Sequence, residues 1–205
     1  MQVDGGEERP TMQGAAAADL PAPKPAWALL EEAGHMKTEG NAFYRERNIR
    51  AAVGRYHRAL LLLRSIDSDV QLNLEAFGSK MPTLTSEQEI LLRDIQVDCF
   101  NNIAACLLQR KSVDYARVLE YSLKVLKRRP ANTKALYRAG VATLELGDAQ
   151  KAKQYLTQAC TLQPNDGNIK RYLQMVEEKI SNELLREKAM YRGMFASSTK
   201  SSSGE

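Results

Sequence analysis

The sequence is short of cysteine, of aromatic residues and of net charge, and each shortage argues against a class of function. Aromatic residues make up 6% and the net charge is only +4, from 29 basic and 25 acidic residues. No basic run alternates with aromatic residues, so we expect no nucleic-acid partner. The three cysteines have neither a Cys-x-x-Cys pair nor a metal-ligand spacing, which predicts buried, reduced thiols. They are Cys99, Cys106 and Cys160.

Long hydrophobic runs are also missing. The most apolar stretch near the N-terminus, residues 14–18, is too short for a signal peptide or a membrane span. Gln2 is incompatible with N-myristoylation, and the last residues do not form a prenylation box. We therefore expect a cytoplasmic protein with no membrane partner.

Signatures of catalysis are absent from the sequence as well. It contains no G-x-G-x-x-G, no P-loop and no nucleophile elbow, and no catalytic pair of carboxylates stands out. His35 and His57 have no neighbouring pattern typical of a metal site or a catalytic triad. These absences favour a protein that is not an enzyme and uses no cofactor.

The chain divides into a helical domain, expected over residues 26–195, and two tails. Residues 1–25 are rich in Gly, Ala, Pro and charge, and residues 196–205 are rich in Ser. Such segments bury too little apolar surface to offset their conformational entropy, so we expect disorder in both. Hydrophobic residues make up 43% of the sequence, enough for one packed helical core.

A repeated pattern within this domain predicts an all-α fold. Small and large residues recur at the tetratricopeptide spacing in about 33–66, 97–132 and 133–166. The small residues suit close helix crossings, and three stacked helix pairs can bury apolar faces that one pair cannot. The third match is the cleanest, whereas the second needs two extra residues around Lys111–Tyr115. We expect a right-handed superhelix of three helix-turn-helix repeats.

An insertion at 67–96 and a long last helix complete the predicted domain. Residues 68–81 are typical of a loop, whereas Ser86 with Glu89 predicts a capping box that starts a helix running to about Gln109 and projecting beyond the stack. A capping helix is expected over 168–195. Its apolar stripe comprises Leu173, Val176, Ile180, Leu184 and Leu185.

Five polar residues fall on the first helices of the repeats, which line the concave side of such a superhelix. They are Lys37, Asn41, Asn102, Lys134 and Arg138. The pairs on repeats one and three are four residues apart and so share a helix face. Cations hold carboxylates through charge-assisted hydrogen bonds, and amides pair with peptide backbone. We interpret the set as a socket for an acidic peptide C-terminus; the repeat phase favours Asn102 over its neighbour Asn101.

These positions carry a resemblance to known proteins. Lys37-Thr-Glu-Gly-Asn41, Asn102-Ile-Ala-Ala-Cys106 and Lys134-Ala-Leu-Tyr-Arg138 resemble the dicarboxylate clamp of tetratricopeptide co-chaperones. The segment from Arg186 to Phe195 is similar to the last helix of the large immunophilins. Residues 56–108, residues 134–140 and the Tyr-x-Gly-Met-Phe motif most resemble the tetratricopeptide repeat protein 9 family. The resemblance implies binding of the Glu-Glu-Val-Asp tails of heat shock proteins 90 and 70 through the five clamp residues.

Other interpretations of the same residues remain open. Basic residues on a helix face are often only solvated, and Lys124–Arg129 ends a helix where cations favour the dipole. A second function is a structural scaffold that binds a cytoskeletal or other folded partner through the insertion or the convex face. In either case we expect a monomer.

Overall fold

The computed structural model describes residues 24–67 and 84–200, with side chains up to Arg192. This part of the chain forms seven helices and no strand. The helices are α1 (Ala26–Arg45), α2 (Ile49–Ser65), α4 (Ser86–Leu108), α5 (Tyr115–Arg128), α6 (Thr133–Glu145), α7 (Ala149–Leu162) and α8 (Gly167–Lys200). The loop predicted at 68–81, residues 1–23 and residues 201–205 lie outside the described residues. Residues 196–200, predicted as part of a disordered tail, instead continue α8 as far as Lys200.

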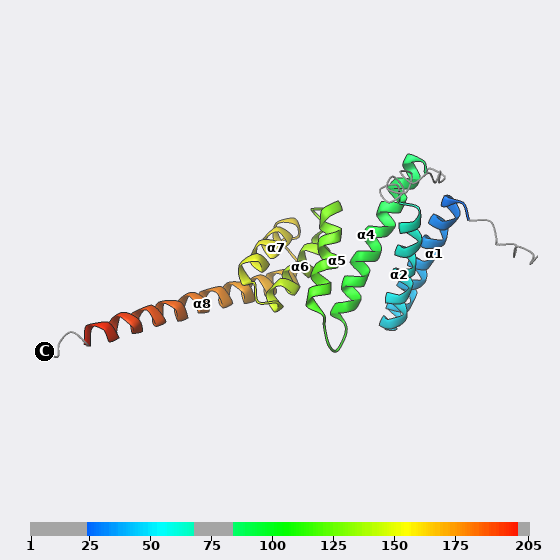
Figure 1. Cartoon of the computed structure of the whole chain (residues 1–205). Coiled ribbons are helices and arrows are strands. Elements are labelled where there is room, and N and C mark those ends of the chain that lie inside the picture. Colours follow the sequence, from blue (N-terminus) through cyan, green and yellow to red (C-terminus); the bar gives the residue numbers. More distant parts are fainter. Residues whose placement is uncertain (1–23, 68–83, 201–205) are drawn as a thin grey trace, which may run out of the picture.

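The helices stack in consecutive pairs, α1 with α2, α4 with α5, and α6 with α7, and α8 packs on α7 (Figure 1). The first helices of successive pairs lie side by side: α1 contacts α4, and α4 contacts α6. They therefore form one layer of the stack. The predicted superhelix of three tetratricopeptide pairs with a C-terminal capping helix is confirmed.

Short polar residues begin the helices that follow tight turns. A side-chain oxygen of each accepts a hydrogen bond from the backbone N–H three residues on, which satisfies a donor that the first turn leaves unpaired. These caps are Asn48, Asp114, Asn132 and Asp148. The turns before Asn48 and Asp148 contain Arg47 and Gly147, both at positive φ (61° and 96°). The first and third pairs thus close through the same tight turn.

Close helix crossings explain the same spacing of a glycine and a large residue in the first and third repeats. A Cβ at Gly40 would lie 2.6 Å from the ring of Tyr56, and a Cβ at Gly140 would lie 2.6 Å from Leu156 Cγ. Tyr56 and Leu156 are both buried. Each glycine therefore makes room for the large side chain of the partner helix.

The start of α4 differs by one residue from the predicted capping box. Thr85, not Ser86, is the cap: its hydroxyl accepts from the Gln88 N–H, and its own N–H donates to Gln88 Oε1. Thr85 has the extended backbone of a cap (φ −70°, ψ 160°), whereas Ser86 is already helical. The helix is long, at 23 residues, but only its first turns project, because Leu92 and Ile95 are buried in the core.

The capping helix also packs over a shorter stretch than its apolar stripe predicts. Val176 is buried and Leu173 and Ile180 are partly buried against the third pair. Leu184 and Leu185 are 50% and 61% exposed, because α8 has by then left the stack, as Figure 1 shows. None of the described helices combines the length and apolarity needed to cross a membrane.

Candidate functional site

A hydrogen bond between Asn41 and Asn102 links α1 of the first pair to α4 of the second pair. The Asn41 Oδ1 atom accepts a hydrogen bond of 2.8 Å from the Tyr56 hydroxyl and one of 2.9 Å from Asn102 Nδ2. Both of its lone pairs are thereby used, which holds the Asn41 amide in one orientation. Its amide nitrogen is left to donate, and a peptide backbone carbonyl is a suitable acceptor.

Lys37, one turn before Asn41, forms an ion pair that the sequence did not lead us to expect. Its Nζ atom lies 3.0 Å from Asp98 Oδ2 on α4. Asp98 is four residues before Asn102, so the two share a helix face. That spacing was a signal that could have identified Asp98 as part of the site. The pair is partly exposed, at 25% for Lys37 and 45% for Asp98, so its net energy is modest.

Arg138 approaches the same face of α4 from the other side. Its guanidinium donates to the Asn101 side-chain oxygen, and Asn101 Nδ2 donates to Asn132 Oδ1 over 3.4 Å. Burial lowers the pKa of Arg138, although a guanidinium stays charged at neutral pH. In the described residues Arg138 has no carboxylate partner. It is a half-buried cation held only by neutral groups.

Lys134 lies one turn before Arg138 on α6 and is exposed. It borders a small hollow of about 80 Å³ together with Tyr137 and Asp166. Over residues 24–67 and 84–192 its ammonium group takes part in no ion pair. The two cations of α6 are therefore both without a counter-ion in this part of the protein.

The structure thus brings four of the five predicted residues onto one α4 face through direct contacts. Asp98, Asn101 and Asn102 occupy that face, with Lys37 and Asn41 reaching it from α1 and Arg138 from α6. Both asparagines contribute: Asn102 turns toward α1, and Asn101 toward Arg138. Lys134 extends the row on α6, and within the described residues it forms no hydrogen bond or ion pair with the other four.

Two thiols lie behind this face. Cys99 and Cys106 are free and fully buried on α4. Burial raises the pKa of the Cys99 thiol to about 12 and that of Cys106 to about 11. Both are protonated at neutral pH and act as small apolar packing groups.

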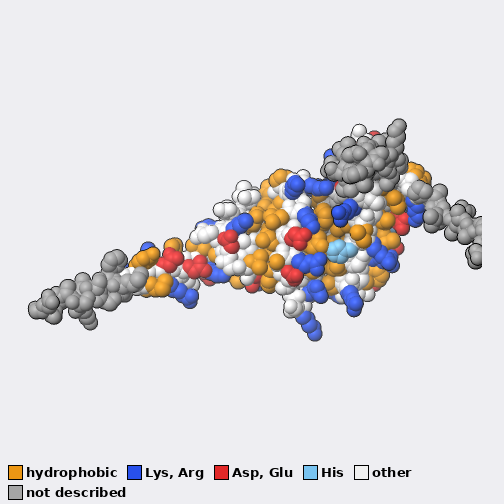
Figure 2. Space-filling model, in the orientation of Figure 1, with side chains coloured by type: hydrophobic (Ala, Val, Ile, Leu, Met, Phe, Trp, Pro, Cys, Tyr) orange, Lys and Arg blue, Asp and Glu red, His pale blue; other side chains and the backbone are white. Residues whose placement is uncertain are grey.

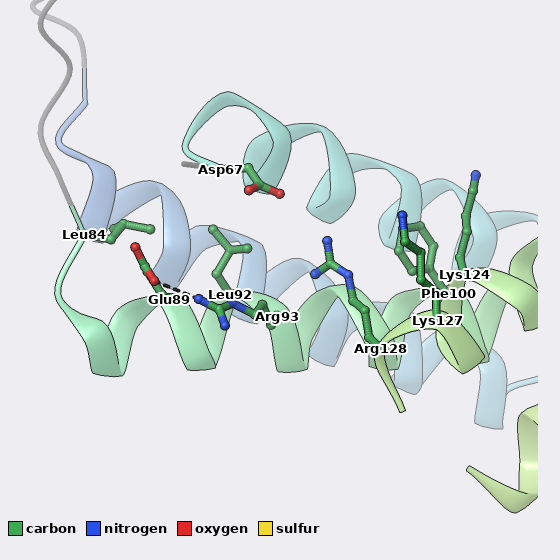
Figure 3. Close-up of a pocket in the computed structure, with 9 residues that line it drawn as sticks. All are labelled: Asp67, Leu84, Glu89, Leu92, Arg93, Phe100, Lys124, Lys127 and Arg128. Carbon is green, nitrogen blue, oxygen red and sulfur yellow. Dashed lines mark hydrogen bonds and ion pairs between the residues drawn. The ribbon is translucent and has the colours of Figure 1, made fainter. Parts of the chain in front are cut away.

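A second hollow, near the other end of α4, contains the basic cluster at the end of α5 (Figure 3). Arg128 donates to Gln96, whose amide nitrogen donates to Asp67 over 3.0 Å. Lys124 pairs with Glu120. Arg129 pairs with Asp94. Arg128 and Arg129 thus tie the end of α5 to α4, whereas the Lys124 pair lies within α5. In the described part of the chain, no group of three or more His, Cys, Asp or Glu residues is placed to hold a metal ion.

Comparison with known proteins places this geometry in context. No protein-family model matches the chain. Tetratricopeptide repeat protein 9C of Xenopus tropicalis is 46% identical over 166 residues, covering 81% of this chain and 93% of that protein.

Solved structures with the same fold include tetratricopeptide domains of other proteins. The C-terminal tetratricopeptide-containing domain of a Plasmodium falciparum FK506-binding protein matches with a TM-score of 0.64 and 26% identity, covering 78% of this chain and 95% of that one. The first tetratricopeptide domain of Spaghetti, solved with a heat shock protein 90 peptide ending in Glu-Glu-Val-Asp, matches with a TM-score of 0.52. It is 16% identical, and the match covers 74% of this chain and 94% of that domain, so it shows the fold alone. With its three helix pairs, its capping helix and its relative in the frog, the chain belongs to the tetratricopeptide repeat protein 9 family.

Proposed function

We propose that the protein is a non-enzymatic adaptor that binds the acidic C-terminal tail of heat shock protein 90 or 70 on its concave layer. The tail ends in Glu-Glu-Val-Asp, and its last residue carries two carboxylates within a few ångströms. Lys37, Asn41, Asn102, Lys134 and Arg138 form the proposed clamp. Such a role is that of a co-chaperone acting as a monomer in the cytoplasm.

The observation that carries the proposal is the pair of uncompensated cations on α6. Arg138 is half-buried and bonded only to an amide oxygen, and Lys134 has no ion pair in the described residues. A carboxylate placed between them would gain charge-assisted hydrogen bonds without first breaking an ion pair. These two residues should therefore contribute most to affinity.

Lys37 differs from Lys134 and Arg138 because its ammonium group already forms an ion pair with Asp98. An incoming carboxylate must compete with the Asp98 side chain for the Lys37 ammonium, whose distance from it is 3.0 Å. Asp98 also adds negative charge beside the proposed ligand. We expect it to lower the affinity for acidic tails and thereby to adjust which tail is bound.

Isothermal calorimetry with an acetylated Met-Glu-Glu-Val-Asp peptide tests the clamp. Arg138→Ala and Lys134→Ala should each weaken binding by about 1.5–3 kcal/mol, the scale of a hydrogen bond to a charged group. Asp98→Asn should strengthen it, because Lys37 is freed and a repulsive charge is removed. Lys151→Ala is the matched control: it removes one exposed cation of α7, outside the concave layer.

Two results would overturn the proposal. One is equal affinity for the peptide and for the same peptide with an amidated C-terminus. The other is an effect of Lys151→Ala as large as that of Lys134→Ala, which would mean that only net charge matters.

A scaffold function through the insertion is the alternative prediction. Its loop, residues 68–83, lies outside the described residues. A pulldown that compares Lys134→Ala with deletion of residues 70–82 separates the two: partners lost only on deletion, such as a cytoskeletal protein, would favour the scaffold.

A further inference from the structure

A groove away from the clamp has an apolar floor and a basic rim. It lies between α2, the end of α4 and α5, and has a volume of about 570 Å³. Ile49, Val53, Ile103, Leu107 and Tyr121 form the floor. We call this hollow the outer groove.

The outer groove is separate from the concave site. With 3.6 residues per turn, Ile103 and Leu107 lie roughly 100–180° around α4 from Asp98 and Asn102. A ligand in the groove and a peptide in the clamp would therefore contact different faces of the same helix.

The charge around the outer groove is of one sign. Arg50, Arg110, Lys111 and Arg117 line it together with His57, and among residues 24–67 and 84–192 no Asp or Glu does so. In the described part of the chain, none of these four cations forms an ion pair. By contrast, neighbouring cations outside the groove do form ion pairs. Arg55, on the same helix as Arg50, pairs with Glu39. On α5, Lys124 pairs with Glu120.

His57 reports the same local excess of positive charge. Its ring lies edge-on to Tyr121, with 6.0 Å between the ring centroids. Burial, with Arg117 and Lys124 nearby, lowers the pKa of His57 below its ordinary value of 6.5. Figure 2 shows one face of the molecule, on which a histidine side chain lies among hydrophobic side chains with several Lys and Arg side chains nearby.

We propose that the outer groove binds a peptide segment in which large apolar side chains are flanked by carboxylates. The apolar side chains would cover Ile49 and Val53, which are partly exposed, and the carboxylates would pair with Arg50 and Arg117. A small polyanion such as an inositol phosphate fits less well, because it would leave the partly exposed floor residues Ile49 and Val53 in contact with water. This site is independent of the clamp and would let the protein hold a second partner at the same time.

Fluorescence anisotropy with a labelled, C-terminally amidated peptide, Glu-Glu-Asp-Leu-Phe-Glu-Asp-Leu-Glu-Glu, tests the groove on the full chain. The double variant Arg50→Glu and Arg117→Glu should weaken binding by about tenfold or more, because two charge-assisted contacts become repulsive. Arg64→Glu is the matched control for charge on α2, since Arg64 is exposed and does not line the groove. It should change affinity by less than about threefold, the screened effect of one distant charge.

Two further comparisons test the contribution of the apolar floor and the place at which the peptide binds. A peptide with Ala in place of Leu and Phe should bind at least about tenfold more weakly, because the apolar contact is lost. Arg138→Ala should leave binding of the amidated peptide unchanged. Circular dichroism of each variant checks that the helices are intact.

Each contrary result would overturn the inference. No binding of the peptide, or equal loss with Arg64→Glu and with the double variant, would exclude a specific groove. Equal affinity for the Ala peptide, or displacement by inositol hexakisphosphate at the same concentration, would make it a simple anion site. If Arg138→Ala no longer bound the amidated peptide, that peptide would lie in the concave layer and not in the outer groove. If Arg138→Ala lost only the binding of the chaperone-tail peptide, the clamp and the outer groove would be separate sites, as proposed.

Discussion

Gly140 shows how a single residue sets the distance between two helices. A Cβ there would lie 2.6 Å from Leu156 Cγ and 2.8 Å from Cδ2, and Leu156 is fully buried. The clash is with the branch point of the side chain rather than with a flexible end. Leu156 cannot move aside without disturbing the core of the third pair.

We expect Gly140→Ala to lower the free energy of unfolding by about 1–3 kcal/mol, the range for overpacked cores. Urea denaturation followed by circular dichroism measures it. Gly54→Ala is the control, because Gly54 is also helical but a Cβ added to it would have no neighbouring atom within 4 Å. That change should be neutral or stabilising by up to about 1 kcal/mol. A Gly140→Ala protein as stable as the parent would show that α6 and α7 can separate freely.

At the scale of the element, α8 has two halves with different roles. Its first half covers the third pair, where Ile169 and Val176 are buried. From Ser181 to Arg192 every residue is exposed, including Leu184, Leu185 and Tyr191. Among the described side chains of α8, those of the first half therefore cap the terminal repeat.

Truncation after Asn182 should change the free energy of unfolding by less than about 0.5 kcal/mol, because the described side chains that it removes, Glu183 to Arg192, are all exposed. Val176→Ala should lower it by about 1–3 kcal/mol, since two buried methyl groups are lost and a cavity is left. Thermal and urea unfolding of both proteins provide the comparison. A truncation as damaging as Val176→Ala would mean that the outer half of α8 packs on something in solution.

At the scale of the whole molecule, the described helices contact one another only within a pair, between consecutive pairs, or between the third pair and α8. One large core joins the first two pairs and reaches Ala142 on α6, and further clusters hold the third pair and α8. Between them lies a small cluster of Val97, Val125 and Ala135. Stability in such a stack is close to a sum of repeat and interface terms, so it need not be uniform along the chain.

Two matched substitutions test this division by hydrogen exchange. Leu63 on α2 and Leu156 on α7 are both fully buried, and conversion of either to Val should remove about 1 kcal/mol. Leu156→Val should raise amide exchange mainly in α6, α7 and α8, and Leu63→Val mainly in α1, α2, α4 and α5. Equal increases in every helix in both variants would show instead that the stack opens as one cooperative unit.

The repeat architecture was readable from the sequence because its signals are local. The spacing of Gly140 and Leu156, and the turn residues before α2 and α7, depend only on one helix pair. The five polar positions followed from the same register, so their helices and faces could be predicted. Their use as a clamp remains a prediction.

Long-range contacts decided what the sequence alone left open. Asp98 meets Lys37, and Asn101 meets Arg138, only because α1 and α6 pack on opposite sides of α4. The outer groove exists because residues of α2, α4 and α5 that are far apart in the chain converge there. Helical period and cap chemistry act over a few residues, whereas the direction in which α8 leaves the stack, and hence the exposure of Leu184, depends on where its neighbours end.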